Sequence, residues 1–207
     1  MQKNAEKLCE AARQALESKK PDQALKHCEA LREEYPDLVE TWLISGQISS
    51  FTGNLQSAED YFECALALEP DNTDILYSYS YCKFMLGENE PCLSLLSRIK
   101  NPESSSVAIN MRIANLYKML GEHDSALEIF KEVSIRSPDS ASSKFEAGEV
   151  LKFKGKFDEA EQCYKQAIAA DDHCSENIES LGCNFIPIKM DISGKNPFKD
   201  LYTFMQF

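Results

Sequence analysis

Apolar and polar residues follow one another along the chain with the spacing of amphipathic helices, and the pattern returns every 34 residues. Glycine marks this period, because four glycines lie 34 residues apart with no insertion or deletion between them. These glycines are Gly53, Gly87, Gly121 and Gly155. The register predicts five units and a partial sixth unit or capping helix at 175–186. The five units are 5–38, 39–72, 73–106, 107–140 and 141–174.

Two columns of this register hold small residues, and a third holds mostly large apolar ones. The eighth position is occupied by Ala12, Gly46, Ser80, Ala114, Gly148 and Gly182. The twentieth position is occupied by Ala24, Ala58, Cys92, Ala126 and Ala160. The twenty-fourth position is occupied by Cys28, Phe62, Leu96, Phe130 and Tyr164. Small residues at fixed points let two helices approach closely, so we expect helix pairs that bury these columns.

Residues 77–84, YSYSYCKF, have the alternation of a strand, because tyrosine occupies every second position at first. On a helix, however, Tyr77, Tyr81 and Phe84 share one face. Tyr79 then lies about 200° away, at a buried position of the repeat. The register places this stretch in the first helix of the third unit, so we predict a helix with aromatic residues on two faces.

The pattern resembles the tetratricopeptide repeat, a 34-residue helix-turn-helix. Residues 155–160, GKFDEA, are similar to the turn of that family, and Trp42 and Gly46 match its first-helix tryptophan and glycine. The first unit departs from the pattern, because Lys19 stands where the other units have glycine. The resemblance covers residues 5–174. It implies an all-α fold, a right-handed superhelical solenoid of antiparallel helix pairs.

The resemblance also implies that the first helices line a concave groove, chiefly through their second, fifth, ninth and twelfth positions. The candidate groove residues are Leu43, Gln47, Asp74, Tyr77, Tyr81, Phe84, Met111, Asn115, Lys118, Phe145 and Lys152. We expect Tyr77, Tyr81 and Met111 to form one apolar patch, because they project from adjacent first helices. Acidic residues such as Glu40 and Asp74 would favour a partner that carries lysine or arginine beside its apolar anchors.

An alternative interpretation is that these aromatic residues pack against neighbouring helices within a tightly wound array. For Phe84 the two interpretations are equally good. For Tyr77 and Tyr81 we favour the groove, because their hydroxyls need water or a hydrogen-bonding partner.

Composition argues against several classes of function. The formal net charge of −12 argues against binding to nucleic acid or to anionic membranes. No apolar run is long enough to span a bilayer, and the N-terminal residues have the pattern of a polar amphipathic helix, so we do not expect a secretory signal. The eight cysteines form no C-x-x-C pair, and no catalytic motif is visible. We therefore expect a cytoplasmic protein with reduced thiols, which is not an enzyme and has neither metal nor cofactor.

Some members of the family hold the C-terminal carboxylate of heat-shock chaperones with lysine, asparagine and arginine from three successive units. The corresponding places in units 1–3 hold Cys9, Arg13, Ile44, Asp74 and Ser78. The register that starts one unit later does not assemble this clamp either. We do not expect heat-shock-chaperone C-termini as partners.

The resemblance and the absence of catalytic motifs together predict a non-catalytic adaptor, which binds a peptide or a partner helix in the groove. The alternative is the repeat region of a larger enzyme, of the glycosyl- or sulfotransferase type. Residues 187–207 do not follow the repeat and are expected to be an irregular, aromatic tail.

Overall fold

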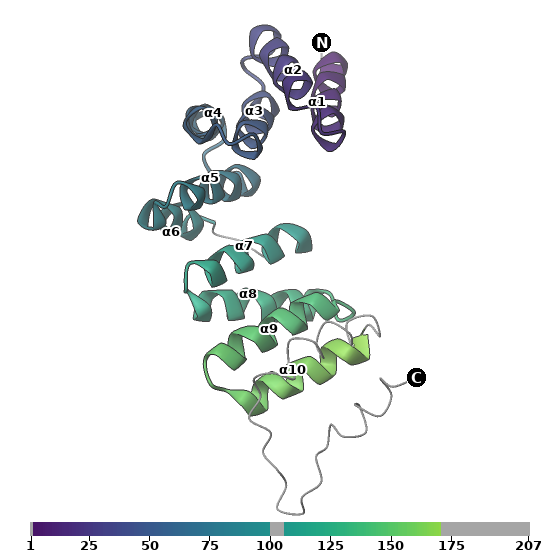
Figure 1. Cartoon of the computed structure of the whole chain (residues 1–207), viewed down its shortest axis with the longest axis vertical. Helices are drawn as coiled ribbons and strands as arrows, with labels where there is room; N and C mark the ends of the chain where they lie inside the picture. Colours follow the sequence, from purple (N-terminus) through teal and green to yellow (C-terminus); the bar gives the residue numbers. More distant parts are fainter. Residues whose placement is uncertain (1, 100–105, 171–207) are drawn as a thin grey trace, which may run out of the picture. The chain divides into compact units, whose positions relative to one another are not determined.

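The structure, a computed structural model, describes residues 2–99 and 106–170 (Figure 1). All regular elements in these residues are α-helices, as the sequence predicts. They are α1 (Gln2–Glu17), α2 (Pro21–Glu34), α3 (Val39–Phe51), α4 (Leu55–Leu68), α5 (Thr73–Met85), α6 (Asn89–Ser97), α7 (Val107–Met119), α8 (His123–Arg136), α9 (Ala141–Phe153) and α10 (Phe157–Ala170). The predicted capping helix at 175–186 and the tail at 187–207 lie outside the described residues. Of the helices that are described, none has both the length and the apolar run of a membrane span.

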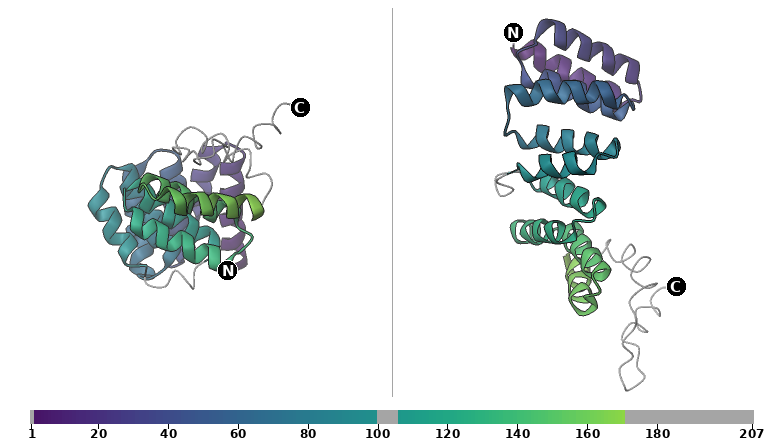
Figure 2. Two further views of the ribbon diagram at one scale, coloured as in Figure 1. Left: turned by 90° about the horizontal axis from the view of Figure 1, so that it is seen from below. Right: turned by 90° about the vertical axis from the view of Figure 1, so that its left-hand side faces the viewer.

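The chain divides into two compact units, Met1–Val133 and Ser134–Phe207. In the first unit, α1 packs against α2, α3 against α4, and α5 against α6 (Figure 2). Contacts between α2 and α3 and between α4 and α5 join consecutive pairs. The first helices of the pairs also touch one another, because α3 contacts both α1 and α5, and α5 contacts α7. In the second unit, α9 packs against α10.

The repeat is visible in the helix bounds. The helices α3, α5, α7 and α9 each contain 13 residues, and each begins 34 residues after the one before. A glycine with φ between 72° and 84° follows each of them in the turn. This left-handed conformation favours glycine, because a Cβ there would be strained. Lys19, which replaces glycine in the first turn, adopts the same region with φ of 56°.

Side-chain caps explain where several helices begin. Asn72 accepts hydrogen bonds from the backbone N–H groups of Asp74 and Ile75, at 3.0 and 3.2 Å, at the start of α5. Ser106 accepts one from Ile109 N–H at 3.2 Å at the start of α7. These oxygens satisfy donors that a helix leaves unpaired in its first turn.

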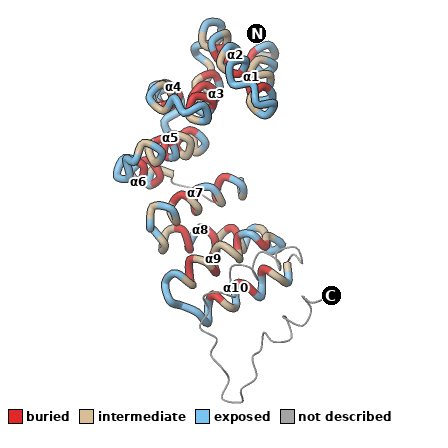
Figure 3. Tube along the Cα trace, in the orientation of Figure 1, coloured by how far each residue is buried: buried red, intermediate tan, exposed pale blue. Residues whose placement is uncertain are grey.

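The predicted columns form the core (Figure 3). The five small residues of the twentieth position are fully buried, and the side chains of the twenty-fourth position are at most 4% exposed. The stretch 77–84 lies within α5, and Tyr79 is buried there at 6% exposure. The predictions of a helix and of an inward-facing Tyr79 are therefore confirmed.

Candidate partner-binding surface on the first helices

Three aromatic rings follow one another along a single face of α5. The ring centroids of Tyr77 and Tyr81 are 6.4 Å apart with the rings stacked, and those of Tyr81 and Phe84 are 6.3 Å apart. Spacings of four and three residues bring these side chains together on a helix. Tyr81 is 39% exposed, whereas Tyr77 and Phe84 are half-buried. Tyr81 is therefore the exposed ring of the three, and its two neighbours on the helix face are partly covered.

Tyr77 and Phe84 pack against a core cluster of α5, α6 and α7 residues. The buried members of this cluster are Cys92, Leu96, Ile109, Ile113 and Leu116. Burial raises the pKa of the Tyr77 hydroxyl, although the charge of Arg112 opposes the shift. Both rings thus contribute to the core on one side and remain partly open on the other.

The other candidates in the first unit differ in exposure. Leu43 is half-buried and packs against the cluster that contains Phe62 and Tyr79. Gln47 is exposed and donates a hydrogen bond from Nε2 to Ser78 Oγ at 3.2 Å, which links α3 to α5. Asp74 is exposed at the start of α5, and three candidates on α7 are half-buried. The three are Met111, Asn115 and Lys118.

Two candidates, Phe145 and Lys152, belong to α9 in the second unit. The Phe145 ring lies 5.9 Å from the ring of Tyr164, measured between centroids. Lys152 Nζ lies 2.6 Å from Glu149 Oε1, and the same oxygen accepts a hydrogen bond from the Tyr164 hydroxyl at 2.5 Å. Both candidates are half-buried, so each offers only part of its side chain to a partner.

A cleft of about 400 Å³ opens between α1 and α3. It is lined by Glu6, Cys9, Glu10, Arg13, Leu38 and Glu40. Three glutamates against one arginine make the lining acidic, while Cys9 and Leu38 supply apolar surface. The sequence register places Glu40 beside the groove, so the cleft extends the candidate surface towards the first repeat.

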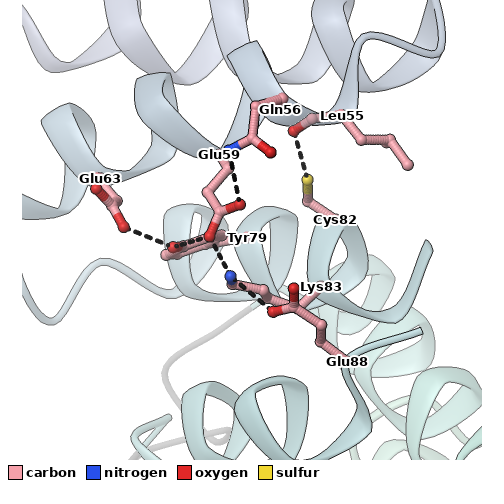
Figure 4. Close-up of polar contacts among 8 residues, drawn as sticks. All are labelled: Leu55, Gln56, Glu59, Glu63, Tyr79, Cys82, Lys83 and Glu88. Atoms are coloured by element: carbon pink, nitrogen blue, oxygen red, sulfur yellow. Dashed lines mark hydrogen bonds and ion pairs between the residues drawn. The ribbon is translucent and has the colours of Figure 1, made fainter. Parts of the chain in front are cut away.

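A polar network fastens α4 to α5 (Figure 4). The Tyr79 hydroxyl lies 3.0 Å from Glu63 Oε1 and 3.2 Å from Glu59 Oε1. Lys83 donates to Glu59 and, at 2.8 Å, to Glu88. Burial and the two neighbouring glutamates raise the pKa of Tyr79. Burial alone would lower the pKa of Lys83, but its hydrogen bonds to the two carboxylates raise it.

Sequence reasoning missed one surface feature, a large apolar residue at the thirteenth position of the repeat. Phe51, Met85 and Met119 are the last residues of α3, α5 and α7, and they are 73%, 52% and 57% exposed. Phe153 holds the same place in α9 and is 73% exposed. The 34-residue register contains this signal, because reading the thirteenth column shows four large apolar residues in succession.

The described residues offer little for metal chemistry. Among them, no group of three or more histidine, cysteine or acidic side chains lies close enough to hold a metal ion. Their six cysteines are free thiols, of which Cys64 is exposed and Cys9, Cys28, Cys82 and Cys92 are buried. Burial raises the pKa of each of these four buried thiols, which disfavours the reactive thiolate.

Stacked helix pairs with an open first-helix face are typical of a protein-interaction repeat. The family model of the tetratricopeptide repeat matches residues 3–173, and the chain belongs to this family of protein-interaction scaffolds. No curated protein matches the chain at a significant level.

Several solved structures share the fold. MamA is 20% identical with a TM-score of 0.64, and the match covers 80% of this chain and 96% of that one. YrrB, described as a tetratricopeptide-repeat protein with an unusual peptide-binding site, is 20% identical with a TM-score of 0.61, over 82% and 89% of the two chains. PilW, described as a type IV pilus biogenesis factor, is 15% identical with a TM-score of 0.68, over 81% and 78%. At these identities the likeness concerns the fold alone.

Proposed function

We propose that the protein is a non-catalytic adaptor that binds a peptide or a partner helix on its first-helix face. The observation that carries this proposal is that Tyr81 is exposed while its two ring neighbours, Tyr77 and Phe84, pack on the core cluster. A large aromatic side chain held in place by its neighbours loses little conformational freedom on binding, which is the character of interface hot spots. The adaptor would use Tyr81 as its central anchor.

In the first unit the contact residues of this proposal are Leu43, Gln47, Asp74, Tyr77, Tyr81, Phe84, Met111, Asn115 and Lys118. In the second unit they are Phe145 and Lys152. Membership of a scaffold family supports a protein as the partner. The peptide-binding site named for YrrB supports a peptide as the form of the ligand. The acidic lining of the cleft at Glu6, Glu10 and Glu40 favours a partner with lysine or arginine near its apolar anchors.

The test compares two aromatic residues of nearly equal exposure. Tyr81 is 39% exposed on α5, and Phe157 is 37% exposed on α10 in the second unit. Partners captured by the wild-type chain are identified, and their affinities for Tyr81→Ala and Phe157→Ala are measured. Loss of an aromatic hot spot costs about 2 kcal/mol, which is roughly a thirtyfold loss of affinity. We expect that loss for Tyr81→Ala and no change for Phe157→Ala.

Tyr77 needs a milder substitution, because its ring packs on the core cluster. Tyr77→Phe removes the hydroxyl and keeps the ring, whereas Tyr77→Ala would leave a cavity and mimic a binding defect by destabilising the fold. Circular dichroism and thermal melting of Tyr81→Ala must match the wild type. The proposal is wrong if folded Tyr81→Ala binds every captured partner as tightly as the wild type does.

A further inference from the structure

The ends of α3, α5 and α7 carry large apolar side chains that the fold leaves in water. We call Phe51, Met85 and Met119 the apolar column; more than half of each side chain is exposed. Among the described residues of the first unit, the other large apolar side chains with substantial exposure are Leu68 and Tyr81. Tyr81 lies one helical turn before Met85 on α5, so it adjoins the column.

Core packing does not explain the apolar column. A residue at the end of a helix, next to an exposed turn, is free to be polar. Single exposed apolar residues are common, but an apolar residue that is exposed at the same position of three first helices in contact with one another makes a recurring apolar surface. Such a surface is a docking site when a partner of matching spacing and charge can cover it.

The spacing of the apolar column selects a helix as the partner. The three first helices α3, α5 and α7 contact one another in chain order. Packed helix axes lie about 8–10 Å apart, so we expect anchors at the same position of neighbouring first helices to be about 10 Å apart. On a partner helix, residues seven apart share a face and are about 10.5 Å apart. On an extended segment, residues of one face recur at about 6.6 or 13 Å, and neither distance fits.

The charges beside the apolar column select a basic partner. Glu90 follows Met85, Glu122 and Asp124 follow Met119, and all three are exposed. Lys83, the nearest lysine on α5, is engaged by Glu59 and Glu88. An amphipathic helix with lysine or arginine next to its apolar residues would therefore be complementary to this edge.

We propose that the apolar column docks an amphipathic helix of a protein partner, with an apolar residue at every seventh position and basic residues beside it. The inference rests on the proposed function for the nature of the ligand. It specifies in addition that the ligand is a basic helix and that it contacts the last residues of the first helices, next to the turns. Methionine suits such a surface, because its flexible thioether adapts to different apolar anchors.

The probe is a labelled synthetic helix with three leucines at heptad spacing in a lysine- and alanine-rich background, measured by fluorescence anisotropy. One control peptide has the same composition with the leucines at unmatched spacing. A second has glutamate in place of every lysine. We expect the wild-type chain to bind the heptad peptide at least tenfold more tightly than either control.

Two double variants test the surface. Met85→Ser/Met119→Ser removes the anchors of α5 and α7, and Glu90→Lys/Glu122→Lys reverses the charge beside them. All four residues are exposed, so the fold should persist. Ile135→Ser is the matched control, because Ile135 is 79% exposed and lies in the second unit. We expect about a tenfold loss of affinity for each double variant and no change for Ile135→Ser, and a weaker interaction in high salt.

Two results overturn the inference: failure of the wild-type chain to prefer the heptad peptide, or unchanged binding by Met85→Ser/Met119→Ser. Peptide binding by the Tyr81→Ala variant distinguishes a failure of this inference from a failure of the proposed function. If Tyr81→Ala loses the peptide while Met85→Ser/Met119→Ser retains it, the apolar column is not the docking surface and the proposed function stands. If Met85→Ser/Met119→Ser loses it while Tyr81→Ala retains it, the column is the docking surface.

Discussion

Gly46 on α3 lies directly against the ring of Phe62 on α4. A Cβ at Gly46 would be 2.5 Å from Cε1 of Phe62, closer than two carbon atoms can approach without displacement. The second unit contains the same relationship, because a Cβ at Gly148 would be 2.6 Å from Cε1 of Tyr164. In both helix pairs a glycine of the first helix thus lets an aromatic ring of the second helix approach its backbone closely.

The first prediction is that Gly46→Ala destabilises the protein by about 1–2 kcal/mol. The clash costs about 1–3 kcal/mol, and the better helix propensity of alanine offsets up to about 1 kcal/mol. Phe62 is 1% exposed, so its ring can move only by displacing the residues that bury it. Urea unfolding measures the change. Adding Phe62→Leu should recover part of the loss in a double-mutant cycle, and strictly additive effects would contradict the contact.

The second prediction concerns the network between α4 and α5. Lys83→Met should destabilise the protein by about 1–2 kcal/mol, because Glu59 would lose its cation while only 16% of its side chain is exposed. Lys165→Met is the control, since Lys165 and its partner Glu161 are more exposed, at 66% and 34%. That substitution should cost less than about 0.5 kcal/mol. Equal effects in thermal melting would mean that the network adds nothing beyond a surface ion pair.

The third prediction is that the free energy of unfolding depends on pH through the thiol of Cys92. Burial raises the pKa of this thiol from 9.0 to about 11. Above pH 9 the unfolded chain loses this proton while the native chain keeps it, so the native state binds more protons and stability falls as the pH rises. The contribution is fully present below about pH 9 and is lost through about pH 11.

Comparison with Cys92→Ala isolates this effect. Tyrosines and lysines titrate in both proteins, so their contributions cancel in the difference between the two unfolding free energies. That difference should be constant from pH 7 to about 9 and should shrink as the pH approaches 11. A difference that stays constant across the whole range would contradict the raised pKa.

The fourth prediction is an order of thiol reactivity. Cys64 is exposed, whereas Cys28 and Cys92 are fully buried and have raised pKa values. Alkylation of the native protein near pH 8, followed by peptide mass spectrometry, should modify Cys64 first. Cys28 and Cys92 should react only at the rate of unfolding. Labelling of Cys28 as fast as Cys64 would show that the α1–α2–α3 core opens locally.

The sequence alone determined the helical repeat, the small columns and the inward position of Tyr79. These features depend on spacing within one helix or on a 34-residue period, and repetition makes each signal visible several times. The residues of the twentieth and twenty-fourth columns are buried in all five predicted units. The polar network was not foreseeable in this way, because Tyr79, Glu59 and Lys83 meet only when α4 and α5 pack together.

Exposure on the first-helix face was decided by the tertiary structure. Tyr77, Tyr81 and Phe84 share one helix face in sequence, yet Tyr77 and Phe84 pack on the cluster around Cys92 and Ile113 while Tyr81 remains open. Helical periodicity gives the direction of a side chain, but the neighbouring helix decides whether it is covered. Met85 and Met119 show the converse, since they are apolar residues at helix ends and yet more than half of each remains exposed.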